Sequence, residues 1–471
     1  LRLRASELAK KAYTPPAGSK LPEELENLDY DQYQQVRFRP ASGPWYDKKL
    51  LFDLRFISRG YLFRDPVKLH LLEGDQNQEI PFRPSMFDYS RLSLKSPLPE
   101  GLDFAGFKLM HRSTVNAPWS EVASFLGASY FRIVGKGLRY GASARALALD
   151  TGEAAGEEFP RLTEFWIETP APLAANVQVL ALLESPSVAG ACRFLLNVGD
   201  QTSTEVEVSL FPRLDTKKYG IAPLTSMFLI GENRTSYIPD FRPEVHDSDG
   251  LLMVTAGGER VWRPLENPKQ HHRISRFPLR GLAGFGLMQR DRSYRSYEDL
   301  EARYELRPSL WVEPLAAWGE GVIELVEIPS PSEYNDNIVA YWVPAQKPKS
   351  GQEMRFRYRL SAVSEEPQSR FLKVTATRIV PAVDKKPERF VVDFEGATLD
   401  TVGARDRIQP RCSIDDGEVK NLQALYNDVT GGWRVVFDVD AAGSEARQVR
   451  LYLEAGGKPL SETWVQELPT P

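Results

Sequence analysis

Strict alternation of apolar and polar residues recurs along this chain and favours β-strands over helices. Phe52, Leu54 and Phe56 alternate with charged residues, and the same period of two returns over residues 204–210 and 354–360. A period of two directs successive side chains to opposite faces of a sheet, so one face can be buried. Thirty-five prolines and 33 glycines interrupt these runs. The pattern predicts an all-β chain built on a large antiparallel sandwich, not on βαβ units.

Helices are expected to be few and short. Segments 6–13, 22–28 and 120–126 each allow one or two helical turns. The best helical pattern covers residues 296–304, where Ser296 and Asp299 have capping-box spacing and three apolar residues share one face. Arg307 precedes a proline and therefore favours a helix end.

We expect two domains, because 471 residues are more than a single hydrophobic core of ordinary size supports. The polar, proline-containing stretch 364–369 is a candidate boundary. We predict a large β-sandwich domain over residues 1–363 and a small immunoglobulin-like β-sandwich over residues 370–471. The second segment has the usual length of an immunoglobulin-like domain and alternating strands of its own.

Composition excludes several classes of function. A net charge of -5 argues against nucleic-acid binding, which needs a basic face. No run of about 20 apolar residues is present to span a membrane. Cys192, Cys412 and five scattered histidines form no metal-binding motif, and no phosphate-binding glycine motif occurs. We expect no cofactor and no metal, and we interpret both cysteines as buried thiols.

Aromatic and acidic residues gather between residues 240 and 345, which permits a saccharide-binding cleft. Trp262, Tyr304, Arg307 and Trp311 lie in this span, together with the run H-D-S-D-G at 246–250. Sugars bind to aromatic faces flanked by carboxylates and arginines, but packing in a core explains the aromatic residues equally well.

Asp247 and Asp336 are the candidate catalytic carboxylates of this span. Each also has a plain structural reading: Asp336 lies in the turn N-D-N before the strand 338–342, and Asp247 lies in a turn before the strand 251–254. An EF-hand calcium loop is excluded because its later ligands are missing. The residues alone leave the catalytic and the turn interpretations open.

Several longer runs resemble the osmoregulated periplasmic glucan biosynthesis proteins, types G and D. They cover nearly the whole chain in order: G-A-S-Y-F-R (127–132), G-E-E-F-P (156–160), F-W-I-E (165–168), G-I-A-P-L-T-S-M-F (220–228), H-D-S-D-G (246–250), W-R-P-L (262–265), G-F-G-L-M-Q-R (284–290), R-P-S-L-W (307–311), W-G-E-G (318–321), L-V-E-I-P (325–329), D-N-I-V-A-Y-W (336–342) and S-E-T-W (461–464).

This resemblance implies a periplasmic protein whose signal peptide has been removed, and an enzyme acting on β-1,2-glucan with inversion, as a glycoside hydrolase or a transglycosylase. Asp336 corresponds to the proposed general acid, and Asp247 to the general base acting through a proton relay. Burial against Tyr334, Tyr341 or Trp342 would raise the pKa of the acid. Tyr304, Arg307, Trp311 and Trp262 are the expected substrate contacts, chosen by residue type and motif.

The alternative is a non-catalytic glucan-binding or scaffold protein that assists a membrane glucan synthase. The two subfamilies also divide on single residues. Asp249 is similar to type D, whereas Asn335 is similar to type G. The subtype, and the choice between hydrolysis and transfer, therefore stay open.

Overall fold

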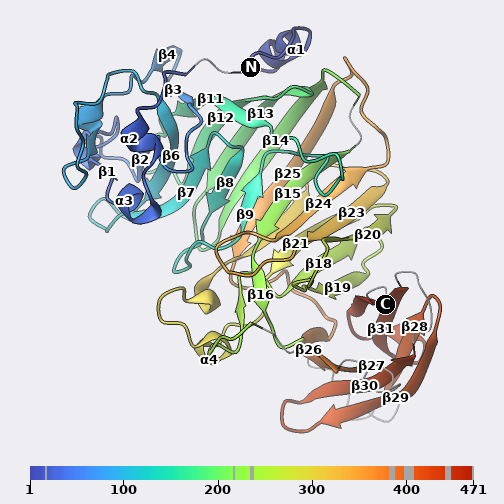
Figure 1. Ribbon diagram of the computed structural model, residues 1–471. Coiled ribbons are helices and arrows are strands. Elements are labelled where there is room, and N and C mark those ends of the chain that lie inside the picture. Colours follow the sequence, from blue (N-terminus) through green and yellow to red (C-terminus); the bar gives the residue numbers. More distant parts are fainter. Residues whose placement is uncertain are drawn as a thin grey trace. The chain divides into compact units, whose positions relative to one another are not determined.

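The protein is mostly β-structure, which confirms the predicted all-β class (Figure 1). The computed structural model describes residues 1–15, 18–215, 218–233, 238–380, 388–396, 408–440 and 447–468. These residues fall into two compact units. Unit 1 comprises Leu1–Leu224, Val312–Val322 and Tyr341–Val363, and unit 2 comprises Thr225–Trp311, Ile323–Ala340 and Ser364–Pro471. Compact packing does not by itself define a domain, so the division between residues 363 and 370 stays a prediction.

Two layers of antiparallel strands make up most of unit 1. One layer has the order β2-β6-β7-β8-β9, and the other the order β4-β3-β11-β12-β13-β14-β25, in which only β3 and β11 pair in parallel. The bounds are β2 Phe52–Ser58, β3 Lys68–Glu73, β4 Gln76–Glu79, β6 Phe104–His111, β7 Ser120–Leu126, β8 Tyr130–Ile133, β9 Ser143–Arg145, β11 Arg161–Glu168, β12 Asn176–Glu184, β13 Val188–Asn197, β14 Thr202–Pro212 and β25 Met354–Val363.

Phenylalanines in edge-to-face contact hold the two layers of unit 1 together. Phe107 and Phe125 belong to the first layer, and their rings lie 5.2 Å from those of Phe165 and Phe194 in the second layer. All four side chains are buried. Aromatic pairs of this kind add to the hydrophobic stabilisation of a sandwich core.

The helices of unit 1 are short and peripheral: α1 Arg2–Ala9, α2 Glu23–Glu26 and α3 Tyr30–Gln34, with the 3-10 turns η1 Pro40–Ser42 and η2 Pro84–Met86. The helical prediction for residues 120–126 is wrong, because this segment is strand β7, paired with β6 and β8. Phe125 packs into the sandwich core, and tertiary burial of this kind overrides local propensity. The remaining short strands are β1 Arg37–Phe38, β5 Phe87–Asp88 and β10 Ala148–Leu149.

Four strands have residues in both units: β15 Tyr219–Ser226, β22 Ser309–Pro314, β23 Gly321–Glu327 and β24 Ile338–Pro344. Unit 2 adds β16 Phe228–Ile230, β17 Val245–His246, β18 Gly250–Thr255, β19 Arg260–Pro264, β20 Arg273–Leu279 and β21 Leu282–Met288. Strand β18 lies between β19 and β21 and pairs antiparallel with both. Across the described residues, no helix combines the length and the apolar character needed to cross a membrane.

The predicted helix over residues 296–304 is also wrong. Helix α4 covers only Tyr294–Tyr297, because Glu298 ends it in the left-handed conformation, with φ of 53°. Asp299 forms an ion pair with Arg242 at 2.7 Å and accepts hydrogen bonds from the next residues of its own loop. Leu300, expected on the apolar face, is 79% exposed. A 3-10 turn, η3 Tyr304–Leu306, follows.

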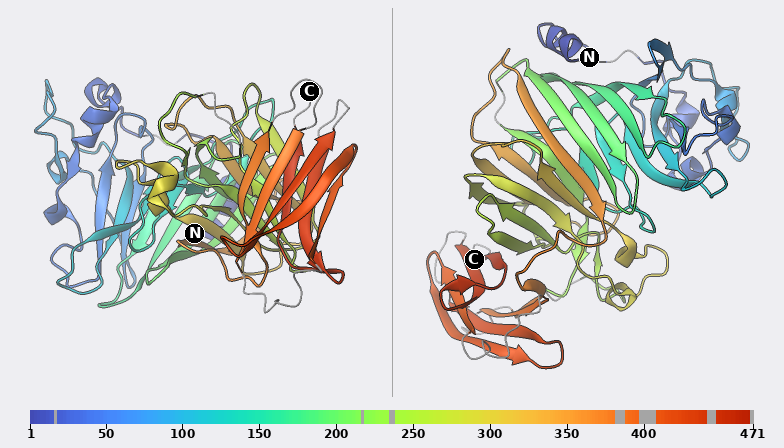
Figure 2. Two further views of the ribbon diagram at one scale, coloured as in Figure 1. Left: turned by 90° about the horizontal axis from the view of Figure 1, so that it is seen from below. Right: turned by 180° about the vertical axis from the view of Figure 1, so that it is seen from behind.

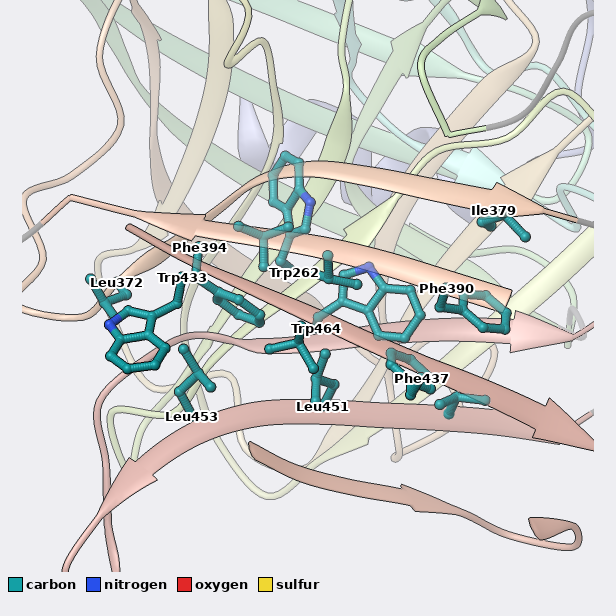
Figure 3. Packing of buried hydrophobic residues seen from close by; sticks show 14 of the residues in the cluster. Trp262, Leu372, Ile379, Phe390, Phe394, Trp433, Phe437, Leu451, Leu453 and Trp464 are labelled. Carbon is teal, nitrogen blue, oxygen red and sulfur yellow. The ribbon is translucent and has the colours of Figure 1, made fainter. Parts of the chain in front are cut away.

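The C-terminal strands form a small sandwich within unit 2, and Figure 2 shows them in orange to red. One sheet has the order β26-β27-β30-β29, and on the facing side β31 pairs with both β28 and β33. Figure 3 shows the core between them, in which Phe390, Phe437 and Trp464 pack together. The bounds are β26 Lys373–Val380, β27 Glu388–Glu395, β28 Ile408–Ile414, β29 Glu418–Asn427, β30 Gly432–Asp440, β31 Arg447–Ala455, β32 Lys458–Pro459 and β33 Thr463–Leu468.

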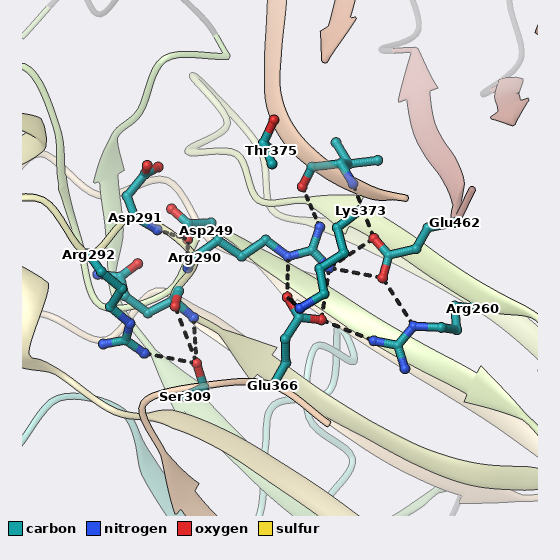
Figure 4. Close-up of polar contacts among 12 residues, drawn as sticks. Asp249, Arg260, Arg290, Asp291, Arg292, Ser309, Glu366, Lys373, Thr375 and Glu462 are labelled. Carbon is teal, nitrogen blue, oxygen red and sulfur yellow. Dashed lines mark hydrogen bonds and ion pairs between the residues drawn. The ribbon is translucent and has the colours of Figure 1, made fainter. Parts of the chain in front are cut away.

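Buried ion pairs join this sandwich to the β18–β21 region of the same unit (Figure 4). Glu462 binds Arg290 at 2.9 Å and Arg260 at 3.2 Å, and Glu366 binds the same two arginines at 2.9 and 3.0 Å. Trp262 belongs to the same hydrophobic cluster as the C-terminal core. The two sets of strands therefore share one interior.

Candidate functional site

Asp247 and the residue after Asp336 are fixed to the same short segment of main chain. The amide of Asp247 donates to the carbonyl of Met227 at 2.8 Å, and the amide of Asn337 donates to the carbonyl of Ser226 at 3.1 Å. All these residues belong to unit 2. The structure therefore anchors both candidate carboxylates, 89 positions apart in sequence, on one three-residue segment, 226–228.

The side chain of Asn337 completes this anchor. Its Oδ1 accepts a hydrogen bond from the amide of Phe228 at 2.8 Å, and its Nδ2 donates to the carbonyl of Phe228 at 2.9 Å. Asn337 is 2% exposed. An amide side chain offers one acceptor and two donors, so it can pair with a strand edge as main chain does. Asn337 thus has a structural role, and it fixes the main chain next to Asp336. This is compatible with both the turn interpretation and the catalytic interpretation of Asp336.

The two carboxylates differ in exposure. Asp247 is 3% exposed, and its Oδ1 forms an ion pair with Nη1 of Arg307. Asp336 is exposed, and Tyr334 is 89% exposed. The expectation that neighbouring aromatic rings bury Asp336 is therefore wrong, because the turn that carries it projects into solvent.

Arg307 links Asp247 to a chain of polar contacts. Its guanidinium lies 4.2 Å from the centre of the Tyr304 ring, and the Tyr304 hydroxyl donates to Oε2 of Glu333. Burial and this hydrogen bond raise the pKa of Tyr304 above its usual value, so the hydroxyl keeps its proton. Glu333 lies three residues before Asp336. The contacts thus run from the candidate base to the turn that carries the candidate acid.

Arg242 holds the other end of this series of polar contacts, at Glu333. It binds Asp240 and Asp299 at 2.7 Å and Glu333 at 2.8 Å. The hydrogen bonds that Arg242 donates to Asp240, Glu333 and Asp299 outweigh partial burial and raise the pKa of Arg242. One guanidinium therefore ties together three loops, which carry residues 240, 299 and 333.

A buried histidine lies directly beside Asp247. His246 is 0% exposed, and its ring stacks on Phe228 with a centroid distance of 5.3 Å. Its Nε2 is 2.8 Å from Oε2 of Glu244 and 3.4 Å from Oδ1 of Asp249. Burial alone would lower the pKa of His246, but these two carboxylates raise it to about 9.

The two tryptophans that were predicted to contact substrate do not lie beside Asp247. Trp262 is 3% exposed and lies under Arg290, whose guanidinium is 3.5 Å from the ring centre. Trp311 is partly buried and packs against the core shared with the C-terminal sandwich. Tyr304 and Arg307 are brought to Asp247, whereas both tryptophans belong to a hydrophobic core. Their role in binding substrate stays a prediction.

Sequence reasoning missed Arg242, Glu333, Asp299 and Glu244. Glu333 stands in the same run as Asp336, S-E-Y-N-D-N, and could have been noted for that reason. Its partner Arg242 lies 91 positions earlier. A single sequence carries no signal for a pairing over that separation.

Known proteins are similar to this chain over nearly its whole length. The family model described as "Periplasmic glucan biosynthesis protein, MdoG" matches residues 1–468. Glucans biosynthesis protein G of Ralstonia nicotianae is 44% identical, with 99% of this chain and 94% of the relative covered. Protein G of Rhodopseudomonas palustris is 43% identical, with 99% and 92% covered.

Glucans biosynthesis protein D 1 of Ralstonia nicotianae is 44% identical, with 100% of this chain and 91% of the relative covered. Similarity to a protein G and to a protein D is therefore equal in degree, which agrees with the mixed residues at positions 249 and 335. The resemblance noted in the sequence is confirmed, and the chain belongs to the MdoG family of periplasmic glucan biosynthesis proteins.

Proposed function

We propose that the protein is a periplasmic enzyme that acts on β-1,2-glucan with inversion of the anomeric carbon, as a glycoside hydrolase or a transglycosylase in glucan biosynthesis. Membership of the family over the whole chain supports glucan as the substrate class and the periplasm as the compartment. The acid and base roles follow from the family resemblance, and one observation supports them: Asp247 and the turn of Asp336 are anchored on the same segment, 226–228.

Asp336 is the general acid in this proposal. It must carry a proton when the leaving oxygen departs, and an exposed carboxyl meets this need only when substrate covers it. A bound sugar removes water from the carboxyl and raises its pKa, because the charged form loses hydration. Bound glucan therefore raises the pKa of the Asp336 carboxyl, so that it carries the proton a general acid needs.

Asp247 is the general base in this proposal and acts on the attacking water through a proton relay. An inverting enzyme needs its base on the face opposite the acid, with carboxyl groups about 6.5–9.5 Å apart when a single water lies between them. Asp247 is buried and paired with Arg307. A relay of hydroxyls or waters allows such a base to serve a water that it does not touch.

The test is product analysis with linear β-1,2-glucan. Mass spectrometry separates the two reactions, since each hydrolysis adds one water to the summed products and cyclisation adds none. Asp336→Asn should reduce turnover by at least about 100-fold, the usual scale of general acid catalysis. Asp428→Asn, an exposed aspartate on the β29–β30 turn, is the matched control and should keep full activity.

The alternative, a glucan-binding scaffold for a membrane glucan synthase, gives a different result in the same experiment. It predicts calorimetric binding of glucan with unchanged chain masses. An Asp336→Asn variant as active as the parent would remove the acid assignment, and absence of any product from the parent would favour the scaffold.

A further inference from the structure

A compact group of ionisable side chains lies beside the candidate base. Ligand atoms of Glu244, His246 and Asp249 all lie within 4.8 Å of one another, and so do those of Glu232, Glu244 and Asp291. Glu244 is common to both sets. Four carboxylates therefore face one imidazole in a largely buried space, an arrangement that a protein compensates with protons or with a metal ion.

Hydrogen bonding fixes the orientation of the His246 ring. Gln289 donates from Nε2 to the carbonyls of His246 and Tyr304, at 2.9 and 3.3 Å, so its Oε1 is the atom that faces Nδ1 of His246 at 3.0 Å. Nδ1 must then carry a hydrogen. A metal-binding histidine is held in the same way, by a hydrogen bond from its other ring nitrogen.

The other ring nitrogen, Nε2, is directed at carboxylate oxygens, with Glu244 at 2.8 Å and Asp249 at 3.4 Å. A metal ion would take the place of the proton that these groups share. Ligand atoms bound about 2.1 Å from one ion lie roughly 3.0–3.4 Å from each other. The distance from Nε2 to Asp249 matches such an edge, and the distance to Glu244 is shorter and is that of a hydrogen bond.

Asp249 provides a second, independent observation. Its Oδ2 accepts hydrogen bonds from the amides of Arg290 and Asp291. Its Oδ1 is buried and has no hydrogen-bond partner among the described residues, although Nε2 of His246 lies 3.4 Å from it. A buried carboxylate oxygen without a donor is costly. An ion at this position would satisfy it.

A small cavity lies beside Asp249. It has about 20 Å³ of space for the centre of a water-sized sphere, and its polar lining includes Glu232, Asp249, Asp291, Arg290, Thr375 and Thr377, whereas Glu244 and His246 do not line it. About 10–15 Å³ on this measure is enough for one water. Asp249, Asp291 and Thr375 are labelled in Figure 4. One bare or partly hydrated ion fits.

The neighbouring arginines are already engaged. Arg290 is held by Glu366 and Glu462, and Arg292 donates to the carbonyls of Glu305 and Arg307. Arginine therefore balances only part of the negative charge of the four carboxylates.

We propose that Glu244, His246 and Asp249 bind one divalent metal ion, with Glu232 and Asp291 on the open side of its coordination shell. Mixed imidazole and carboxylate ligands suit Mn²⁺ and Zn²⁺ better than Ca²⁺, which prefers oxygen alone. The ion holds the residues on both sides of Asp247. The site does not depend on the glucan activity proposed above.

Direct binding measurements test this proposal. The full-length chain, without an affinity tag, is treated with EDTA, dialysed at pH 7.5 and titrated with Mn²⁺. Loss of the free Mn²⁺ signal in electron paramagnetic resonance should show one saturable site per chain, and calorimetry with Zn²⁺ should give the same stoichiometry. The melting temperature should rise with metal concentration, since the ion binds the folded state.

Two isosteric variants locate the ion. Asp249→Asn and Glu232→Gln remove charge without changing shape, and we expect each to weaken Mn²⁺ binding at least tenfold. Asp336→Asn is the matched control and should bind Mn²⁺ as the parent does. Near-ultraviolet circular dichroism in EDTA checks that the variants are folded. Absence of saturable binding below millimolar Mn²⁺, or equal affinity in both variants and the parent, would overturn the proposal.

Discussion

Arg307 contacts two partners of different chemistry, a carboxylate and an aromatic ring. It neutralises Asp247 by an ion pair and lies over the ring of Tyr304. Arginine suits this position because its planar guanidinium binds a carboxylate at its edge and an aromatic ring at its face. The same pair also stabilises the charged form of Asp247, which is the form that a general base requires.

Replacing Arg307 should therefore affect stability as well as activity. Arg307→Gln should lower the free energy of unfolding by about 3 kcal/mol, because Asp247 loses its guanidinium partner in a buried setting. Urea denaturation measures the change. In a double-mutant cycle, Arg307→Gln with Asp247→Asn should show coupling above about 1 kcal/mol. Strictly additive losses would mean that the pair contributes nothing.

The two thiols should be unreactive in the folded protein. Burial raises the pKa of Cys192 and of Cys412 to about 12, so almost no thiolate is present near neutral pH. We expect iodoacetamide at pH 8 to label both residues in urea and neither within an hour under native conditions, as read by peptide mass spectrometry. Rapid native labelling of Cys192 would show that β13 opens readily.

At the scale of elements, the candidate site depends on loops held together by side chains. Strands β16 and β17 are short and pair over few residues. The loops that carry Asp240, Asp299 and Glu333 meet at Arg242. Ion pairs on the protein surface are weak individually, but one arginine shared by three carboxylates forms a network.

Loss of Arg242 should loosen these loops while the sheets stay intact. Arg242→Ala should increase amide hydrogen exchange in peptides covering residues 298–303 and 331–336, with little change in peptides from β13 and β14. Arg295→Ala, an exposed arginine on α4, is the matched control and should leave exchange unchanged. Equal protection in the two variants would show that Arg242 does not hold the loops.

Prediction from sequence succeeded for strands. It failed where contacts between residues far apart in sequence determine the local structure. The alternating runs at β2, β14 and β25 were identified because a period of two is a local property. Residues 120–126 and 296–304 were predicted as helix because their local pattern allowed it, whereas packing of Phe125 and the pairing of Asp299 with Arg242 determine their structure. Asp247 and Asp336 were identified through family resemblance, and Arg242 has no local signal at all.

At the scale of the whole molecule, each compact unit has its own basis of stability. Unit 1 contains a sandwich core of phenylalanines in stacked and edge-to-face contact. Unit 2 combines a hydrophobic core with buried charges, in which Arg260 and Arg290 are each shared by Glu366 and Glu462. Charges of this kind make the stability of unit 2 dependent on pH.

Acid should weaken unit 2 through Glu366. Burial alone would raise the pKa of Glu366, but Arg290 and Lys373 outweigh it and the pKa is lowered. A lowered folded pKa contributes stability above the unfolded value of about 4.3, and this contribution is lost as pH falls through the folded value. Between pH 6 and pH 3, urea unfolding of Glu366→Gln should therefore depend on pH less steeply than that of the parent. Parallel curves would contradict the assignment.

The amide of Asn337 has a consequence for how this family can vary. Because the side chain pairs with Phe228 at both its amide and its carbonyl, the chain is fixed immediately after Asp336 whatever precedes it. Glu333 is held separately by Arg242 and Tyr304, whereas the exposed residues Tyr334 and Asn335 can be replaced without moving Asn337. Substitutions at positions 334 and 335 would therefore change the surroundings of Asp336, which lies in the loop just before β24, while the start of that strand keeps its place.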